Sequence, residues 1–261
     1  MSRNATMRIA VLSDLHGNLL ALEAVLADLR RRGPFDQIVV AGDLVWSGPW
    51  PAEVVDRVRA LNAVVIQGNT DAFFCRTADN PPAGKQEERF VAHLTWMRER
   101  LGPERVRYLA SLPFSHRISP APGGDLLVVH ANPTDYDRPI SPHISDAELD
   151  ELLLVAGHEP DWRALAFGHL HIPFIRRWRG RLLVNVASVG LPLDGDPRAA
   201  YAILTWDGAL WQAEHYRVDY EVPVVAYHMR HSGMPRGAHF AERLMAARSG
   251  PGMPAAMLMA Q

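Results

Sequence analysis

The sequence predicts an α/β protein in which two mixed β-sheets pack face to face, with helices on their outer faces. Residues 7–66 alternate short apolar runs with helical segments, a rhythm typical of parallel strands joined by helices. The second half of the chain contains pairs of apolar runs separated by short turns, which indicate antiparallel hairpins. Parallel and antiparallel strands in one chain indicate a mixed architecture.

Three short apolar runs near the N-terminus are predicted to be neighbouring parallel strands, at residues 7–12, 37–41 and 63–66. Helices are predicted between them at 18–32, which Gly33-Pro34 ends, and at 51–61, which begins with proline. Ligands of such sheets bind beyond the carboxyl ends of the strands. The residues that follow each run are therefore the candidate functional residues.

The rest of the chain is predicted to complete one domain over residues 1–250. A polar loop at 79–84 leads into a helix at 86–109 that breaks at Gly102-Pro103, and residues 79–112 are predicted to form a small helical cap insertion beside the site. The remaining elements are hairpins at 114–118 with 125–129, 174–178 with 181–186, and 201–206 with 210–217, a strand at 164–167, and helices at 146–156 and within 222–248. Residues 251–261 show no pattern and are predicted to be a flexible C-terminal tail.

Composition argues against several classes of function. The formal net charge of −2 provides no bulk attraction for nucleic acid or another polyanion. The single cysteine, Cys75, cannot form an internal disulfide and suits a reducing compartment. Residues 1–6 are polar, and no apolar run approaches the roughly 18 residues of a membrane helix. We therefore expect a cytoplasmic protein without a membrane anchor.

Acidic, amide and imidazole side chains follow the predicted strands at five places: Asp14-x-His16, Gly42-Asp43, Gly68-Asn69, His130 and Gly168-His169-x-His171. In extended backbone, residues i and i+2 point to the same side, so Asp14 and His16 are predicted to face one ion together. A histidine taken alone is more often a hydrogen-bonded structural residue. Gly-Asp and Gly-Asn pairs are also ordinary turn chemistry.

This ordered set resembles the calcineurin-like metallophosphoesterase superfamily, from residue 7 to at least residue 189. The later run 184–192, followed by 194–198, is similar to the small prokaryotic branch of phosphodiesterases and diadenosine tetraphosphatase relatives. Each motif alone is explained by a structural or turn role. Because all five occur in the order and spacing of the family, we interpret them together as metal ligands. The resemblance implies a four-layer αββα sandwich and an enzyme that hydrolyses phosphoric ester bonds.

The resemblance also implies a dinuclear metal centre and its ligands. One ion is expected on Asp14, His16, Asp43 and His171, and the other on Asp43, Asn69, His130 and His169, with Asp43 bridging. These seven residues are the predicted catalytic set, and Asn18, Thr70 and Arg198 are predicted substrate contacts. Imidazole and carboxylate ligands suit two divalent ions of Mn, Fe, Zn, Co or Ni. Two such ions leave positive charge at the site, which attracts an anionic phosphate ester.

Two departures from better-known relatives narrow the expected activity. The arginine that follows the second motif in protein Ser/Thr phosphatases is absent after Asp43, and Thr70 stands where many relatives have a proton-donating histidine. We expect in-line attack of a metal-bridging hydroxide on phosphodiester or phosphoanhydride bonds of nucleotide-like small molecules. If another residue supplies a proton, His93 on the cap is the first candidate. A protein Ser/Thr or small-molecule phosphomonoesterase is the alternative enzyme, and a non-catalytic scaffold with this fold is the other alternative.

Overall fold

The computed structural model describes residues 6–77, 88–154 and 157–248. Its strands are β1 (Met7–Leu12), β2 (Gln37–Val40), β3 (Val64–Val65), β4 (Ser115–Ile118), β5 (Leu126–Val129), β6 (Ala164–Phe167), β7 (Phe174–Trp178), β8 (Arg181–Asn185), β9 (Ala199–Trp206) and β10 (Trp211–Val218). Its helices are α1 (Leu19–Arg32), α2 (Pro51–Arg59), α3 (Asn69–Thr77), α4 (Glu88–Ser111), α5 (Asp146–Leu153), α6 (Val222–His231) and α7 (Gly237–Ala246).

The strands form two five-stranded sheets, and each sheet is mixed. The first has the order β10-β9-β1-β2-β3 and the second the order β4-β5-β6-β8-β7. In the first sheet β1, β2 and β3 are parallel, while β9 and β10 are antiparallel to their neighbours. In the second, β5, β6 and β8 are parallel, and β4 and β7 close the two edges as hairpin partners. The predicted hairpins and the mixed α/β class are confirmed.

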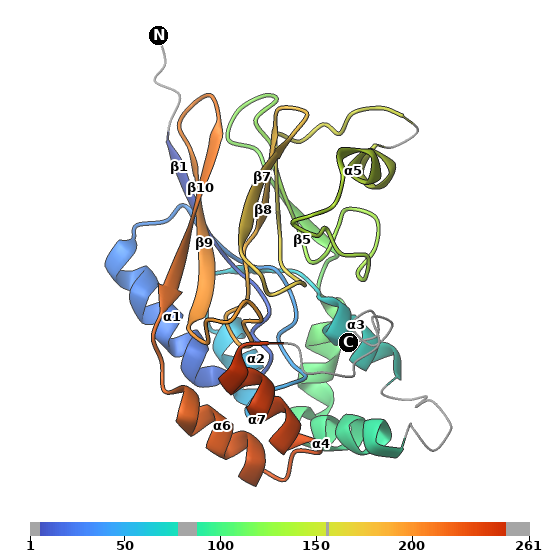
Figure 1. Ribbon diagram of the computed structural model, residues 1–261. Coiled ribbons are helices and arrows are strands. Elements are labelled where there is room, and N and C mark those ends of the chain that lie inside the picture. The colour runs from blue at the N-terminus through green and yellow to red at the C-terminus, as the bar shows by residue number, and fades with distance from the viewer. Residues whose placement is uncertain (1–5, 78–87, 155–156, 249–261) are drawn as a thin grey trace.

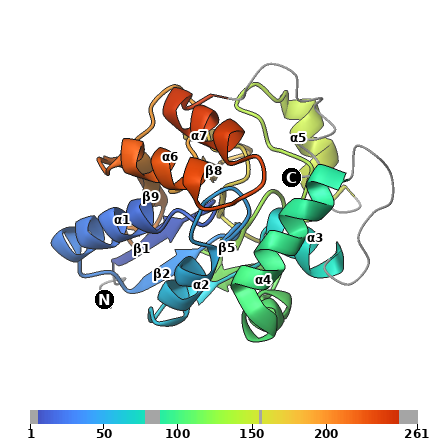
Figure 2. The same cartoon turned by 90° about the horizontal axis from the view of Figure 1, so that it is seen from below.

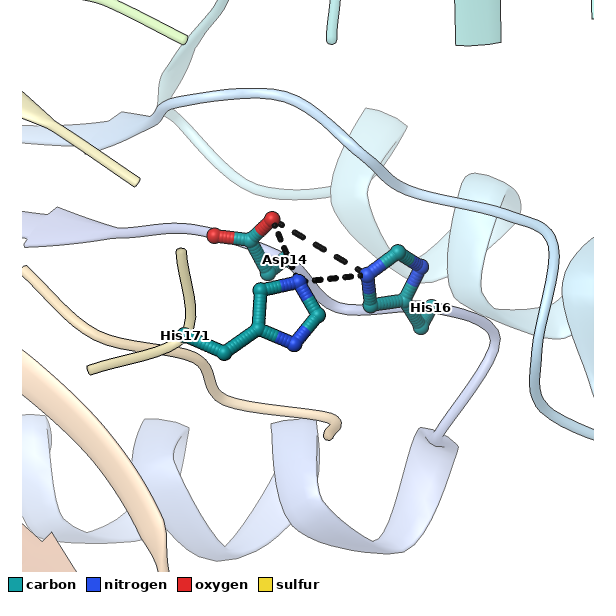
Figure 3. A group of neighbouring side chains, drawn as sticks. All are labelled: Asp14, His16 and His171. Atoms are coloured by element: carbon teal, nitrogen blue, oxygen red, sulfur yellow. Dashed lines mark hydrogen bonds and ion pairs between the residues drawn. The ribbon is translucent and has the colours of Figure 1, made fainter. Parts of the chain in front are cut away.

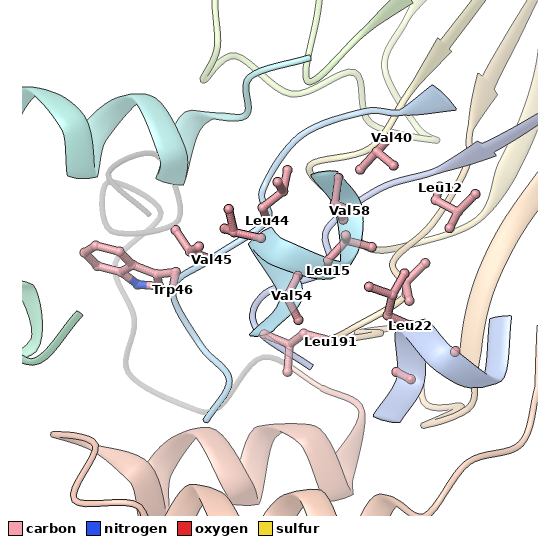
Figure 4. Packing of buried hydrophobic residues seen from close by; sticks show 14 of the residues in the cluster. Leu12, Leu15, Leu22, Val40, Leu44, Val45, Trp46, Val54, Val58 and Leu191 are labelled. Carbon is pink, nitrogen blue, oxygen red and sulfur yellow. The ribbon is translucent and has the colours of Figure 1, made fainter. Parts of the chain in front are cut away.

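Alternate residues of β1 pack into two different hydrophobic cores, because successive strand residues point to opposite faces of the sheet. Ile9 and Val11 pack between the two sheets, where they meet the inward face of the second sheet. Ala10 and Leu12 point to the other side, into a core formed with helices. Figure 4 shows this core close by, with Leu12 next to Leu22 of α1. Because both faces are covered there, the strand is buried and apolar from Ile9 to Leu12.

The outer face of the second sheet is covered by α5. Leu149 and Leu152 of this helix pack with Leu165 and Phe167 of β6. In Figure 1, α5 lies on the side of the sheets opposite to α1, so the layers run helix, sheet, sheet, helix. The predicted four-layer αββα sandwich is confirmed. None of the described helices is both long enough and apolar enough to cross a membrane.

Helix α4 is the described part of the predicted cap. Its backbone leaves the helical region at Gly102, where the break was predicted. Leu94, Met97 and Leu101 enter the same core as α1 and α2, and α4 packs beside α2 and α3 (Figure 2). The predicted loop at 79–84 and the predicted tail at 251–261 lie outside the described residues. The division into one domain with a cap stays a prediction.

Helix α3 is an element that the sequence patterns do not predict, because Gly68-Asn69 marks only the end of the preceding apolar run. The helix begins at Asn69, and the N–H of Ala72 donates to the carbonyl of Gly68 at 3.0 Å. Nine residues are too few for a stable isolated helix, so packing decides its formation. Asn69 and Thr70 thus lie in the first turn of a helix.

Candidate metal centre

The residues predicted as ligands all follow strands that run parallel to a neighbour. They are Asp14 and His16 after β1, Asp43 after β2, Asn69 after β3, His130 after β5, and His169 and His171 after β6. The two sheets bring the ligand side chains at these strand ends close together, with His171 Nε2 3.1 Å from Asp14 Oδ1 and His130 Nε2 3.5 Å from Asp43 Oδ1. Six of the seven residues are buried, and His169 is partly exposed.

The backbone at the site is left-handed rather than extended, which corrects the sequence argument for Asp14 and His16. Their φ angles are 56° and 47°, and Asp43, His169 and His171 have φ angles of 55°, 68° and 60°. Residues with a Cβ rarely adopt this region, and such conformations persist where surrounding structure enforces them. Here the N–H of Asp14 donates to the Gly42 carbonyl at 3.0 Å. The two side chains do meet, through a tight turn.

Two glycines allow the loops to approach one another closely. A Cβ on Gly68 would overlap the Asp43 carboxylate, and a Cβ on Gly168 would overlap Ser13 Oγ and Asp14 Oδ2. With Gly168 in place, the N–H of His169 donates to Asp14 Oδ2 at 3.0 Å. These glycines therefore have a steric role beyond ordinary turn chemistry.

Asp14, His16 and His171 form the first cluster (Figure 3). His171 Nε2 lies 3.1 Å from Asp14 Oδ1 and 3.0 Å from His16 Nε2. The Nδ1 atoms of both histidines contact backbone carbonyls, of Val45 at 3.2 Å for His16 and of Leu191 at 2.5 Å for His171. Because a carbonyl only accepts, Nδ1 carries the proton in each neutral ring and Nε2 carries a lone pair.

With both rings neutral, the first cluster collects electron pairs without a donor between them. Asp14 Oδ1 is buried and accepts no hydrogen bond, while two Nε2 lone pairs face it and each other. Burial lowers the pKa of His16 to about 3, so this ring is neutral at neutral pH. In the absence of a cation, burial alone would raise the pKa of Asp14, but the attraction and hydrogen bond of a protonated imidazole, His171 first, hold it below its usual range. A cation that binds here takes the place of such a proton. A charged carboxylate with neutral imidazoles is the state that binds a divalent cation.

Asp43, Asn69 and His130 form the second cluster. His130 Nε2 lies 2.9 Å from Asn69 Oδ1 and 3.5 Å from Asp43 Oδ1, while its Nδ1 contacts the Ala41 carbonyl at 2.8 Å. Asp14, Asp43 and His130 also place one ligand atom each within 4.8 Å of one another. The second carboxylate oxygen of Asp43 faces the first cluster, with Oδ2 at 3.7 Å from His16 Nε2. Asp43 thus stands between the two clusters.

The titration of the second cluster differs from that of the first. Burial raises the pKa of Asp43 to about 7. Burial alone would lower the pKa of His130, but the carboxylates of Asp43 and Asp14 outweigh it and the pKa is raised. A proton on His130 thus partly neutralises the carboxylates of Asp43 and Asp14. A metal cation would neutralise the same charge when it binds. The donor set of both clusters fits the metals predicted from the sequence.

His169 joins the second cluster through its ring position. Its centroid lies 5.3 Å from that of His130, and its Nε2 contacts the Asp137 carbonyl at 3.0 Å. The other ring nitrogen, Nδ1, is then the lone-pair atom. Burial lowers the pKa of His169 to about 3, so the ring is neutral.

The predicted substrate contacts have structural partners. Asn18 is fully buried, caps α1 by accepting from the N–H of Ala21, and donates to the Gly190 carbonyl at 2.9 Å. Thr70 is buried, and its N–H donates to Asp43 Oδ1 at 2.9 Å. The exposed Arg198 pairs with the carboxylate of Asp196. A contact of Asn18, Thr70 or Arg198 with substrate stays a prediction.

His93 does not have the properties of a proton donor. It is buried in the helical layer, with its ring 4.9 Å from that of Trp46 and 5.6 Å from that of Phe240. Its Nε2 contacts the Trp46 carbonyl at 2.7 Å, and burial lowers its pKa to about 4. A neutral ring cannot protonate a leaving group near pH 7. The position of His93 therefore does not support a role as proton donor, because α4 turns this residue toward the core.

Two groups of supporting residues were missed from the sequence. The buried carboxylate of Asp71 accepts the N–H groups of Leu44 at 3.0 Å and Gly68 at 3.2 Å, and thereby joins the loops that carry Asp43 and Asn69. Ser188 donates to the Asp14 carbonyl at 2.9 Å. Ser188 lies in the run 184–192 that carries part of the resemblance, and Asp71 follows the Gly68-Asn69 motif. The partners of both are backbone atoms, which the sequence does not reveal.

Comparison with known proteins agrees with this architecture. A family model for the calcineurin-like phosphoesterase superfamily domain matches residues 7–209. An uncharacterized protein of Methanocaldococcus jannaschii is 30% identical over 235 residues, which are 82% of this chain and 88% of that protein. The crystal structure of a metallophosphoesterase from Sphaerobacter thermophilus is 31% identical, with a TM-score of 0.71, and the match covers 92% of this chain and 99% of that chain. A putative diadenosine tetraphosphatase, 21% identical with a TM-score of 0.50 over 81% of this chain and 95% of that chain, shares the fold.

The four-layer sandwich and its Asp/His clusters define a phosphoester hydrolase with groups that could hold metal ions. The chain belongs to the calcineurin-like phosphoesterase superfamily, as the order and spacing of its motifs predicted. It is a metallophosphoesterase.

Proposed function

We propose that this enzyme uses two divalent transition-metal ions to hydrolyse phosphodiester or phosphoanhydride bonds in nucleotide-like small molecules. The observation that carries the proposal is the convergence of imidazole lone pairs and carboxylate oxygens at two adjacent clusters. Asp43 supports the two-ion arrangement, because one of its oxygens faces His16 and the other faces His130. A carboxylate in that position suits a bridging ligand.

The residues of the chain contribute fixed positions and charge balance. Val45, Leu191 and Ala41 hold the three Nδ1 protons, so that His16, His171 and His130 direct Nε2 into the site. Two carboxylates, Asp14 and Asp43, only partly offset two divalent ions, which leaves a net positive site for an anionic phosphate. When bound, the ions supply an activated water for in-line attack and stabilise the charge of the transition state.

The preferred type of phosphate bond follows from the lack of a general acid beside the two clusters. Thr70 stands at the position where many relatives have a proton-donating histidine. Its hydroxyl donates to the Val45 carbonyl at 3.4 Å. His93 is neutral and faces the core, so neither residue protonates a leaving group. General acid catalysis is typically worth about 10²–10⁴-fold. Substrates whose leaving oxygen carries negative charge well, such as aryl diesters and dinucleoside polyphosphates, should therefore react much faster than alkyl phosphates.

A phosphomonoesterase that acts on proteins or small molecules is the alternative enzyme. No arginine follows Asp43: the chain continues with Leu44, Val45 and Trp46, and Trp46 packs 5.8 Å from Phe73, centroid to centroid. Monoesters carry an extra charge that such an arginine would bind. The present residues favour diesters and anhydrides.

The test compares kcat/KM for aryl diesters of graded leaving-group pKa, diadenosine tetraphosphate and a phosphoserine peptide, each with Mn²⁺. We expect a steep leaving-group dependence and at least about 10²-fold preference over the peptide. Asp14→Asn should remove activity, while His143→Ala, a change at an exposed histidine outside both clusters, should leave it unchanged. Equal rates on the phosphoserine peptide would favour the monoesterase alternative.

A further inference from the structure

The motif His130-Ala131-Asn132-Pro133 contains a buried residue to which the metal centre gives no role. Asn132 is 0% exposed. Its Oδ1 accepts the N–H groups of Thr134 at 2.7 Å and Asp135 at 3.0 Å. Its Nδ2 donates to Asp135 Oδ1 at 3.0 Å and to the Arg138 carbonyl at 2.8 Å. One side chain therefore ties together both ends of the loop 132–138.

Asp135 continues this network from inside the loop. Its Oδ1 accepts the N–H groups of Asp137 at 2.8 Å and Arg138 at 2.7 Å. The peptide units on both sides of Asp137 are thereby fixed. The carbonyl of Asp137 is left pointing at His169 Nε2, 3.0 Å away.

The direction of that last hydrogen bond decides which atom of His169 can act as a ligand. A carbonyl only accepts, so Nε2 of His169 must be the donor and Nδ1 must hold the lone pair. The backbone N–H of His169 is held separately, by Asp14 Oδ2. Its ring orientation and tautomer therefore depend on the loop that Asn132 organises.

We propose that Asn132 is a positioning residue for the second ion: through the loop 132–138 it holds the Asp137 carbonyl that orients His169. The inference rests on the two-ion function proposed above. Partners that orient a ligating histidine typically contribute about 10–100-fold to metal affinity. Asn132 should therefore influence the second ion strongly and the first ion little, since His16 and His171 are oriented by other carbonyls.

The test measures Mn²⁺ binding by calorimetry for wild type, Asn132→Ala, His169→Ala and the double variant. We expect Asn132→Ala to weaken the second ion about 10–100-fold and the first less than about 3-fold. In the His169→Ala background the Asn132 change should have no further effect on the second ion, because its influence passes through that ring. Ser145→Ala, which removes the cap of α5, is the matched control and should leave both affinities unchanged.

Thermal unfolding in chelator shows whether each variant is folded. If Asn132→Ala does not fold, Asn132→Asp keeps the acceptor oxygen, removes both donated hydrogen bonds and should give the same selective loss. Unchanged affinity for both ions in the folded variant overturns the positioning role and leaves the proposed function intact. Equal weakening of both ions, or effects that add to those of His169→Ala, also overturns it. A wild type that binds only one ion overturns the two-ion function and this inference with it.

Discussion

Replacing Asp43 by asparagine should have opposite effects on metal binding and on the stability of the metal-free protein. The amide has the shape of the carboxyl group and can still accept the N–H of Thr70, which lies 2.9 Å from Oδ1. It loses the charge that faces His16 and His130. Both ions should therefore bind more weakly. Without ions, removal of a charge that is 98% buried should stabilise the fold.

The magnitude follows from the pKa. Burial raises the pKa of Asp43 from 3.8 to about 7, and each pKa unit corresponds to about 1.4 kcal/mol. Ionised Asp43 thus costs about 4 kcal/mol, a net figure that already includes its attraction to His130. A raised pKa means that the contribution of Asp43 to stability is complete below 3.8 and is lost as the pH rises through about 7. The stabilisation by Asp43→Asn should be largest at pH 8, fall to roughly 2 kcal/mol at pH 5 and vanish only below about pH 3.8.

The assay is thermal unfolding in chelator at pH 8 and pH 5, followed by Mn²⁺ titration at pH 8. At pH 8 the variant should unfold roughly 5–15 °C above wild type, and added Mn²⁺ should raise the midpoint of wild type much more than that of the variant. Asp161→Asn, a change at an exposed carboxylate paired with Arg117, is the control and should alter neither quantity appreciably. A variant no more stable than wild type at pH 8 would show that the buried charge is not destabilising. Two ions bound with wild-type affinity would refute the bridging role.

Three further changes test the site. Gly68→Ala places a methyl group against the Asp43 carboxylate, so metal content should fall and activity should drop at least about 10²-fold; full metal content by elemental analysis would contradict this contact. His93→Phe preserves a ring in the aromatic cluster. Because burial keeps His93 neutral, the variant should show the same leaving-group dependence of kcat/KM as wild type. A steeper dependence in the variant would show that His93 donates a proton to the leaving group. Since burial holds the pKa of His16 at about 3, acid should release the ions by protonating His130 and Asp43 as the pH drops below about 7. Saturating Mn²⁺ should move this loss of activity to lower pH, and an acid limb that does not move with added Mn²⁺ would exclude ligand protonation as its cause.

The sequence by itself determined the class of fold and the identity of the candidate ligands. Strand β1 and the three hairpins are local patterns, because apolar runs and turn residues lie next to one another in the chain. The ligands could be found because each stands within four residues of the end of an apolar run, and parallel strands end on one side of a sheet. Helix α3 escaped detection because its first turn coincides with a motif and its stability comes from packing.

Tertiary structure alone decided how these side chains meet. The left-handed turn at Asp14 and His16 replaces the extended backbone that i, i+2 spacing suggested, and it is enforced by backbone bonds to the loop after β2. The position of His93 in the core follows from the way α4 packs, which spacing along the helix does not specify.

The choice of ligating nitrogen is the clearest case. His16, His171 and His169 are each oriented by a carbonyl, of Val45, Leu191 and Asp137 respectively, between 20 and 32 residues away. Every residue has a carbonyl, so such a partner leaves no mark in the amino-acid sequence. The sequence therefore determined which residues can bind metal, while the folded backbone decided which atom of each histidine faces the site.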